Sequence, residues 1–246
     1  MPQAPTIEQR VAACQAPTDQ PVIMRQQWRS LLFLHWPITP AEIQQRLPKG
    51  LHIDTYEGSA YLGVVPFYMH ALRPKYCPPV PGISNFPELN LRTYVYDEAG
   101  NPGVWFFSLD AQSHISVWFA RALFNLNYHY ARMHYQRDAA GHILHSSARP
   151  DHPQQLFCYR PTGPAYTATA DSLDHFLVER YRLFAQKKSG QLMRGRIHHR
   201  PYQIQSAQVS QHSTDLFKIN GFNEPNQPPT HVCYSECADV SVYPMR

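Results

Sequence analysis

The segment LNLRTYVYDEAGNPGVWFFSLD, residues 89–110, carries the strongest fold signal in this sequence. Two runs rich in β-branched and aromatic residues, 89–96 and 104–110, flank a group of turn residues at 97–101. Because such runs favour strands and turn residues between them favour a tight reversal of the chain, the segment predicts a β-hairpin.

The first strand of this hairpin has a polar face. Successive side chains of a strand point to opposite sides, so Arg92, Tyr94 and Tyr96 lie together, opposite an apolar face that contains Leu91 and Val95. Exposure to solvent is the simplest explanation of such a face, and a polar interior is the alternative. The pattern alone favours the solvent-exposed surface.

The regions on both sides of the hairpin repeat this short-strand pattern. Prolines number 23 against 11 glycines, and proline breaks helix interiors, so short strands and loops predominate. Strands and helices do not alternate as they do in a parallel sheet. The predicted fold class is therefore α+β, a mainly antiparallel sheet or barrel with a few packed helices. Further strands are predicted over residues 28–36, 51–55, 60–72, 130–137, 142–148, 155–160, 192–199, 204–209 and 232–240, and helices over residues 6–14, 39–47, 114–124 and 173–186.

Length and composition restrict the domain organisation. Of the 246 residues, 43% are hydrophobic and 16% are charged, which is too apolar for a disordered chain. We expect residues 1–24 to form an N-terminal arm and residues 25–246 to form a single domain. The formal net charge is +4 and like charges do not gather in long runs, so nucleic acid is not an expected partner.

No segment predicts contact with a membrane. The apolar run at residues 31–36 is far shorter than the roughly 20 residues of a membrane span, and residues 1–20 lack the basic and apolar regions of a signal peptide. Five scattered cysteines, an odd number, suit reduced thiols better than a set of disulfides. We therefore expect a cytoplasmic protein.

Four stretches together resemble one family of bacterial proteins. They are LHWP at 34–37, NFPELNLRTYV at 85–95, PGVWFFSLDA at 102–111 and RGRIHHRP at 194–201. On these stretches the chain is similar to the DUF2071 family of uncharacterised proteins over nearly its whole length. That family in turn resembles the acetoacetate decarboxylase-like superfamily, and this resemblance implies a β-barrel-centred α+β domain that encloses a small ligand cavity.

The resemblance to acetoacetate decarboxylase also implies site residues. Arg29 matches an arginine in the strand before that enzyme's first helix, and Glu88 matches its cavity glutamate. Ser108 and Asp110 match the ends of a Tyr-Leu-Asp segment in its central hairpin. The enzyme forms a Schiff base through one of two adjacent lysines, whereas the matching segment here is LNYH at 126–129. The resemblance therefore does not extend to Schiff-base decarboxylation.

The candidate catalytic residues are Glu88, Tyr128 and His129. A carboxyl group buried among apolar neighbours has a raised pKa and can act as an acid or a base. A phenol donates a hydrogen bond to a carbonyl or enolate oxygen, and imidazole moves protons near neutral pH. Packing between elements with satisfied hydrogen bonds is the simpler alternative for Tyr128 and His129, and Glu88 is as readily a turn residue.

The candidate substrate-binding residues are Arg29, Arg92, Tyr94, Ser108 and Asp110. A guanidinium group binds a carboxylate through two parallel hydrogen bonds, so the two arginines are candidates for a carboxylate clamp. An internal ion pair with Glu88 or Asp110 is the alternative for each arginine.

No pattern predicts a metal ion or a cofactor. The close groupings His142-x-x-His145, His198-His199 and Cys233-x-x-x-Cys237 match no strong ligand motif. Glycine-rich nucleotide-binding loops and the Gly-x-Ser-x-Gly hydrolase motif do not occur in the sequence.

Two further cationic features are weaker candidates. Arg194, Arg196 and His198 share one strand face, which could hold an anion but is more often a solvated surface. Lys75 lies in the proline-rich loop predicted over residues 73–87, and a loop folded over a barrel mouth would bring this lysine inward.

The sequence thus leaves two main hypotheses. The first is a barrel that binds a small molecule with a carbonyl or carboxylate group and catalyses proton transfer on it without a Schiff-base lysine. The second is a non-catalytic ligand-binding or sensing barrel. A third hypothesis makes the sheet surface an interaction module, which leaves a homo-oligomer open.

Overall fold

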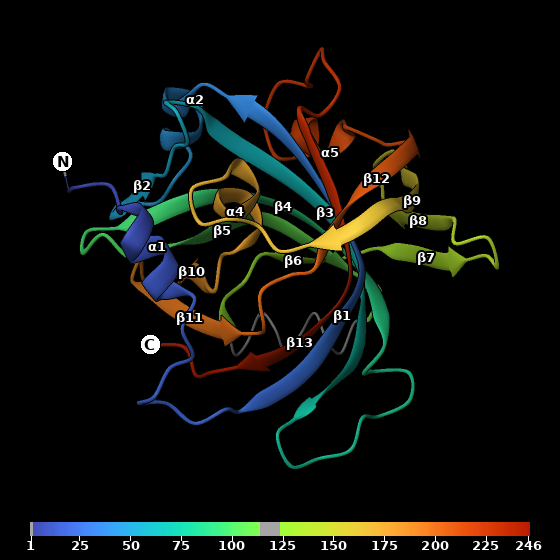
Figure 1. Ribbon diagram of the computed structural model, residues 1–246, viewed down its shortest axis with the longest axis horizontal. Helices are drawn as coiled ribbons and strands as arrows, with labels where there is room; N and C mark the ends of the chain where they lie inside the picture. Colours follow the sequence, from blue (N-terminus) through green and yellow to red (C-terminus); the bar gives the residue numbers. More distant parts are fainter. Residues whose placement is uncertain (1, 114–123) are drawn as a thin grey trace.

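The computed structural model describes residues 2–113 and 124–246 and consists mainly of β-strands with a few short helices (Figure 1). The helix predicted over residues 114–124 lies outside the described residues apart from its final position. The strands are β1 (Met24–Ile38), β2 (Leu51–Ile53), β3 (Ala60–Pro74), β4 (Phe86–Asp97), β5 (Pro102–Ala111), β6 (Tyr128–Tyr130), β7 (Arg132–Arg137), β8 (Ile143–Ala148), β9 (Gln155–Tyr166), β10 (Arg182–Gln186), β11 (Leu192–His198), β12 (Ile204–Gln211) and β13 (His231–Val242). The helices are α1 (Ile7–Ala13), α2 (Pro40–Gln44), α4 (Leu173–Val178) and α5 (Asp215–Ile219).

Seven of the strands pair into a closed ring. Their order is β1, β3, β4, β5, β10, β11 and β13. The pairing of β13 with β1 closes the ring. Two pairs, β10 with β5 and β6 with β5, are parallel, whereas the other described pairs are antiparallel. The hairpin predicted at residues 89–110 is the β4–β5 pair of this ring. The prediction of a mainly antiparallel α+β fold is confirmed.

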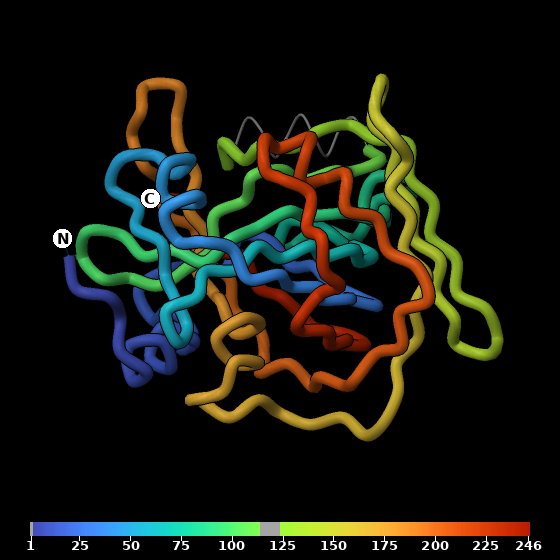
Figure 2. Tube along the Cα trace, turned by 90° about the horizontal axis from the view of Figure 1, so that it is seen from above, coloured from blue at the N-terminus to red at the C-terminus, as the bar shows by residue number. Residues whose placement is uncertain are grey.

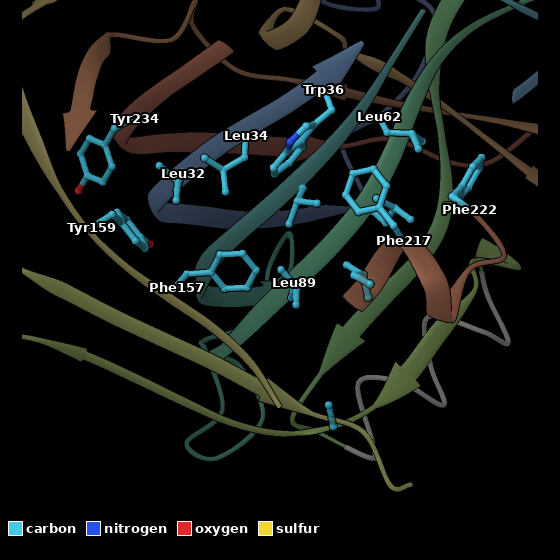
Figure 3. Close-up of a cluster of buried hydrophobic side chains, with 14 of the residues drawn as sticks. Leu32, Leu34, Trp36, Leu62, Leu89, Phe157, Tyr159, Phe217, Phe222 and Tyr234 are labelled. Atoms are coloured by element: carbon cyan, nitrogen blue, oxygen red, sulfur yellow. The ribbon is translucent and has the colours of Figure 1, made fainter. Parts of the chain in front are cut away.

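A second layer covers the outer face of the ring. From β13 the sheet continues through β12, β9, β8 and β7, which run along one side of the molecule (Figure 2). Together with α5 these strands pack on the ring through a cluster that includes Leu34, Leu89, Phe157 and Phe217 (Figure 3). Each of these buried side chains contributes about 1.5–3 kcal/mol by leaving water.

The inner face of the ring forms a separate buried cluster. Phe33 on β1, Phe67 on β3 and Cys233 on β13 belong to it, and we call the region on this face the ring interior. Because the second layer covers the other face, all of the residues of β4 are buried. The expectation that Arg92 and Tyr94 face solvent is therefore wrong, since the ring closes around them.

The helix predicted over residues 173–186 is wrong in its second half. α4 ends at Val178, and residues 182–186 form β10 instead. Leu183 and Phe184 pair with β5 on one side and with β11 on the other. These pairings between distant segments override the helical spacing of the local sequence.

The N-terminal arm is fixed to the body of the molecule. α1 begins with a capping box, in which the side chains of Thr6 and Gln9 each accept a hydrogen bond from the other residue's backbone N–H. Arg10 of this helix pairs with the fully buried carboxylate of Asp54 at 2.6 Å. The two termini lie on the same side of the molecule in both views (Figures 1 and 2). In the described part of the chain, no helix is both long enough and apolar enough to span a membrane.

Candidate functional site

β4 presents a row of polar side chains to the ring interior. Glu88, Asn90, Arg92 and Tyr94 alternate with leucines and a threonine that face the second layer. Glu88 lies opposite Phe67 in the strand pairing, which fixes the face on which this row lies. The strand rises about 3.4 Å per residue, so the Cα atoms of Glu88 and Arg92 are about 14 Å apart.

Glu88 and Tyr128 form a buried pair at one end of this row. The hydroxyl of Tyr128, on β6, donates a hydrogen bond of 3.1 Å to Oε2 of Glu88. Burial raises the pKa of Glu88 from 4.5 to about 8, although hydrogen bonds from Asn90 and Tyr128 lower it in part. A carboxyl group with this pKa exchanges protons readily near neutral pH.

Arg92, between Asn90 and Tyr94 in this row, is a buried cation without a carboxylate partner in the described chain. Only 8% of the residue is exposed, and its Nη2 donates to the carbonyl of Leu177 at 3.0 Å. Its guanidinium carbon lies 5.3 Å from the ring centre of Phe33 and 5.6 Å from that of Tyr94. Its Nε has no hydrogen-bond acceptor among the described residues. Such a site favours an anion that supplies the missing acceptors.

A second buried nitrogen without a hydrogen-bond partner in the described chain, Nε2 of His199, faces the same region. His199 packs at 4.2 Å and 4.3 Å, between ring centres, from Tyr181 and Tyr202. Its Nδ1 donates to the carbonyl of Arg200, and its buried Nε2 has no partner in the described part of the chain. Burial lowers the pKa of His199 to about 4, so Nε2 is an acceptor at neutral pH. An unsatisfied buried polar atom costs about 1–3 kcal/mol, so a polar guest stabilises this interior.

Tyr94 continues into a chain of hydrogen bonds that leaves the ring interior. Its hydroxyl lies 2.7 Å from Nε2 of His35, and Nδ1 of His35 lies 2.8 Å from Nδ1 of His231. Nε2 of His231 lies 2.8 Å from Oδ1 of Asp174, on α4. Burial lowers the pKa of His35 well below 6.5, with His231 and Arg92 adding to the effect. The hydrogen bond from His231 lowers the pKa of Asp174.

Sequence reasoning missed His35, His231 and Asp174. The one local signal is the position of His35 inside the apolar run at 31–36, where a polar side chain needs a partner. Its partner His231 is 196 residues away in the chain, so only the β1–β13 pairing brings the two rings together.

Asp110 and Ser108 lie on the outer face of the ring. In the β4–β5 pairing they stand opposite Leu89 and Leu91, which face the second layer. Oδ1 of Asp110 accepts a hydrogen bond from Nε of Arg149 at 2.6 Å, and Ser147 donates to its other oxygen at 2.8 Å. Ser108 accepts a hydrogen bond from Asn220. The structure thus places both residues in links between the layers, on the opposite face of the sheet from Glu88, although the charge of Asp110 still adds to the raised pKa of Glu88.

The alternation of β6 separates the two adjacent candidates on it. Tyr128 stands opposite Leu109 and His129 opposite Asp110, so their side chains point to opposite faces. The structure therefore brings Tyr128 together with Glu88 in the ring interior and places His129 on the side of Asp110.

Arg29 is exposed and does not reach the ring interior. Its Nε donates to Oε1 of Gln27, and it lines a groove of about 440 Å³ on the outer surface together with Arg25 and Arg73. Bulges in β1 and β3 at this point turn the backbone, and Ser30 and Ala71 both have φ of 53°. Of the two arginines predicted to bind a carboxylate, only Arg92 lies in the ring interior.

The weaker cationic candidates have structural partners. Arg194 pairs with Asp97 at 2.7 Å, and Nη2 of Arg196 donates to the backbone carbonyls of Ala13 and Gln15 in the arm.

None of the five lysines, all of which the structure describes, is buried. Lys75 lies beside the exposed ring of Tyr76. Within the described ranges, no three His, Cys, Asp or Glu side chains gather as a metal-binding group.

The comparisons with known proteins agree with this fold. The model of the DUF2071 family, described as an uncharacterized conserved protein, matches residues 25–239. The uncharacterized protein YqjF of Bacillus subtilis is 38% identical over 226 residues, which cover 91% of this chain and 92% of that protein.

Solved structures with the same fold are much more distant in sequence. An acetoacetate decarboxylase from Legionella pneumophila has a TM-score of 0.64 at 12% identity, covering 94% of this chain and 90% of its own. The enduracididine biosynthesis enzyme MppR, complexed with pyruvate, has a TM-score of 0.62 at 11% identity, covering 94% and 92%. At these identities the likeness shows the fold alone.

Proposed function

This chain belongs to the DUF2071 family, and from that premise we propose that it binds a small oxo acid in the ring interior and moves a proton on it without a Schiff-base lysine. The observation that carries the proposal is Arg92, a buried guanidinium that lacks a carboxylate partner in the described chain. A ligand carboxylate supplies both the counter-charge and the acceptor for Nε.

The remaining polar groups of the row give the proposal its chemistry. With the carboxylate on Arg92, the carbonyl oxygen lies toward Tyr94 and the neighbouring carbon extends along β4 toward Asn90 and Glu88. The carboxylate form of Glu88 takes a proton from that carbon, and the C–H electron pair moves into a C=C bond while the carbonyl π electrons move to oxygen. Return of a proton to the carbon restores the oxo acid. Tyr128 positions the Glu88 carboxyl through its hydrogen bond.

The known fold relatives support this class of ligand. One is an acetoacetate decarboxylase, named for a substrate with a carbonyl and a carboxylate, and another is complexed with pyruvate. The absence of a buried lysine among the five of this chain supports proton transfer that needs no imine.

The binding step is tested with pyruvate and acetone. Pyruvate carries a carboxylate beside its carbonyl and acetone does not, so the comparison tests the part of the ligand that Arg92 would hold. We expect isothermal titration calorimetry to detect pyruvate with the wild-type protein and to lose that binding in Arg92→Gln. Arg29→Gln is the matched control, because this exposed arginine lies outside the ring interior. Equal pyruvate affinity in wild type and Arg92→Gln would remove Arg92 from the site.

The chemical step is tested by proton NMR in D₂O. Reversible proton abstraction replaces the methyl protons of pyruvate by deuterium, so we expect their signal to decay with the wild-type protein. Glu88→Gln keeps the shape of the side chain but cannot take a proton, so binding persists while the decay falls by at least about 100-fold. Equal decay in this variant would exclude Glu88 as the base.

A non-catalytic ligand-binding or sensing barrel is the second candidate function. Residues 126–129 lack the adjacent lysines of acetoacetate decarboxylase, and Arg92 and His199 each have a buried nitrogen without a partner in the described chain; together these favour it. Pyruvate binding without any deuterium incorporation would identify this case.

Location and assembly follow as smaller proposals. All five cysteines are free thiols, which supports a reducing, cytoplasmic compartment. We also propose self-association into a homo-oligomer, and light scattering at several protein concentrations measures it.

A further inference from the structure

A line of four hydrogen-bonded side chains connects the ring interior with the surface. Tyr94 and His35 are completely buried, His231 is nearly so, and the side chain of Asp174 is 27% exposed. The three links measure 2.7 Å, 2.8 Å and 2.8 Å, each within the range of a strong hydrogen bond. The exposed end at Asp174 also accepts a hydrogen bond from the hydroxyl of Tyr166. The inner end lies beside Arg92.

The register of the strand pairings brings these side chains together. His231 of β13 stands opposite His35 of β1, His35 stands opposite Gly63 of β3, and Gly63 stands opposite Arg92 of β4. Because Gly63 has no side chain, the His35 ring lies across β3 and reaches Tyr94 on the next strand. A Cβ at position 63 would lie 2.9 Å from Cδ2 of His35 and 3.4 Å from the Tyr94 hydroxyl.

The acceptor at the outer end sets the direction of every hydrogen bond. An ionised carboxylate only accepts, and a neutral imidazole has one donor and one acceptor nitrogen. Nε2 of His231 therefore donates to Asp174, and its Nδ1 accepts from Nδ1 of His35. Nε2 of His35 is then an acceptor for the hydroxyl of Tyr94. Burial next to Arg92 lowers the pKa of His35, which keeps that ring neutral.

A proton can move along this line with a counter-charge at both ends. The Tyr94 proton passes from Oη to Nε2 of His35, and the Nδ1 proton of His35 passes to Nδ1 of His231. The products are a phenolate beside the Arg92 guanidinium and an imidazolium beside the Asp174 carboxylate. The reverse movement restores the phenol. No other group is consumed in either direction.

We propose that Tyr94, His35, His231 and Asp174 form a proton-transfer chain between solvent and the molecule held by Arg92. Tyr94 is the group that exchanges a proton with the carbonyl or enolate oxygen of that molecule, and the two histidines and Asp174 connect it to water. The role at the ligand rests on the proposed function, whereas the direction of the hydrogen bonds is a property of the protein alone.

The first experiment needs no ligand. In ¹⁵N-labelled protein at neutral pH, two-bond ¹H–¹⁵N spectra report which ring nitrogen of each histidine carries the proton, and His35→Gln and His231→Gln assign the signals. We expect the Nδ1–H tautomer for His35 and the Nε2–H tautomer for His231. The opposite tautomer at either ring would overturn the proposed direction.

The second experiment measures transfer along the line. Saturation of the water signal reports how fast the Nδ1 proton of His35 exchanges with solvent. We expect exchange to be at least about tenfold slower in Asp174→Asn, which keeps the size of the outer side chain but removes its charge. His142→Gln is the matched control, since it breaks an exposed His–Asp pair that lies outside the chain. Equal exchange in wild type and Asp174→Asn would overturn the proposal.

The third experiment joins the chain to the proposed chemistry. In the pyruvate deuteration assay, His231→Gln should lower kcat at least about tenfold and leave KM unchanged, because His231 does not touch the ligand. An unchanged kcat would remove the chain from catalysis. Wild-type protein that does not deuterate pyruvate would contradict the proposed enzymatic function, while the tautomers and water exchange still decide the proton-transfer chain.

Discussion

At Glu88, a carboxyl group that is ordinarily ionised at neutral pH stands in a buried position with a phenol as its partner. Its pKa is 4.5 in an unfolded chain and about 8 in the folded protein. Folding therefore takes up a proton at any pH between these two values. The same property that makes Glu88 a candidate base makes it a source of instability in alkaline solution.

We expect Glu88 to contribute a term to the free energy of unfolding that falls as pH rises from about 5 to about 8. At Glu88 the folded state binds more protons than the unfolded state in this range, so its contribution has a negative slope of at most about 1.4 kcal/mol per pH unit. The buried rings of His35 and His199, whose pKa values are lowered, contribute the opposite slope below about pH 6.5. Urea unfolding at several pH values measures the free energy of unfolding. The difference in unfolding free energy between wild type and Glu88→Gln isolates the Glu88 term, and this difference should fall over the same pH range.

The control for this prediction is Glu224→Gln. Glu224 is a partly exposed carboxyl whose pKa is lowered by its hydrogen bonds to Lys218 and Thr214, so the difference between wild type and Glu224→Gln should not fall over this pH range. A Glu88→Gln variant with the same pH dependence as wild type would show that Glu88 is ionised in the folded protein.

Gly63 is predicted to be a residue that tolerates no side chain. Gly63→Ala places a methyl group against the His35 ring, so we expect a loss of about 1–3 kcal/mol in unfolding free energy and a broken Tyr94–His35 hydrogen bond. The His35 tautomer signal reports the second effect. Gly195→Ala is the control, because it crowds Met245 and Leu183, which are not part of this line. An unchanged His35 signal in Gly63→Ala would contradict the role given to the glycine.

At this scale the sequence allows part of the site to be predicted. Alternation along residues 89–96 correctly puts Arg92 and Tyr94 on one face, and the family resemblance selects Glu88. Alternation cannot tell an inner face from an outer one, because that depends on a second layer formed by distant strands. His35 and His231 escape prediction for the same reason.

Among the elements, β10 shows why local spacing misleads. Residues 182–186 follow a short helix and contain Leu183 and Phe184 at positions that also suit a helical stripe. A short apolar run satisfies helix and strand periodicity equally, so its partners decide the outcome. Here β5 and β11 lie on either side and complete the ring through this segment.

The ion pairs between α1 and the body give an element-scale prediction. Asp54 accepts from Arg180, whose side chain is also buried, at 2.9 Å and from Arg10 of α1 at 2.6 Å. Asp54→Asn should cost about 3–5 kcal/mol in urea unfolding, because it leaves the Arg180 charge buried without a partner. Arg10→Gln keeps the Asp54–Arg180 pair, so it should cost about 1.5 kcal/mol.

The comparison of these two variants separates the roles of the pairs. Equal losses in Asp54→Asn and Arg10→Gln would show that the attachment of α1, and not the buried charge of Arg180, dominates the stability of this cluster.

Over the whole molecule, the fold class follows from the sequence and the closed ring does not. The many prolines and short apolar runs predict strands, and the β4–β5 hairpin is evident from its turn residues. Ring closure depends on pairings such as Leu183 with Val104 and Ile197 with Val242, which join segments far apart in the chain. No local pattern encodes which strands meet over such distances.

The distribution of lysines gives a prediction for the molecule as a whole. Since no lysine is buried in the ring, we expect no covalent adduct after incubation with pyruvate and sodium borohydride, which reduces any imine to a stable amine. Intact-mass spectrometry detects such an adduct, and an authentic acetoacetate decarboxylase serves as the positive control. A pyruvate-dependent mass increase would establish imine chemistry and contradict the proposed mechanism.

The pairing of β1 with β13 also governs how this protein is made. β1 ends at residue 38 and its partner β13 begins at residue 231, so a ribosome must add the whole stretch between them before the ring can shut. Until then one edge of β1 is an unpaired template for foreign strands. Nascent chains that stop short of β13 lack the strand that carries His231, and we expect them to be the form that chaperones bind and that aggregates during synthesis.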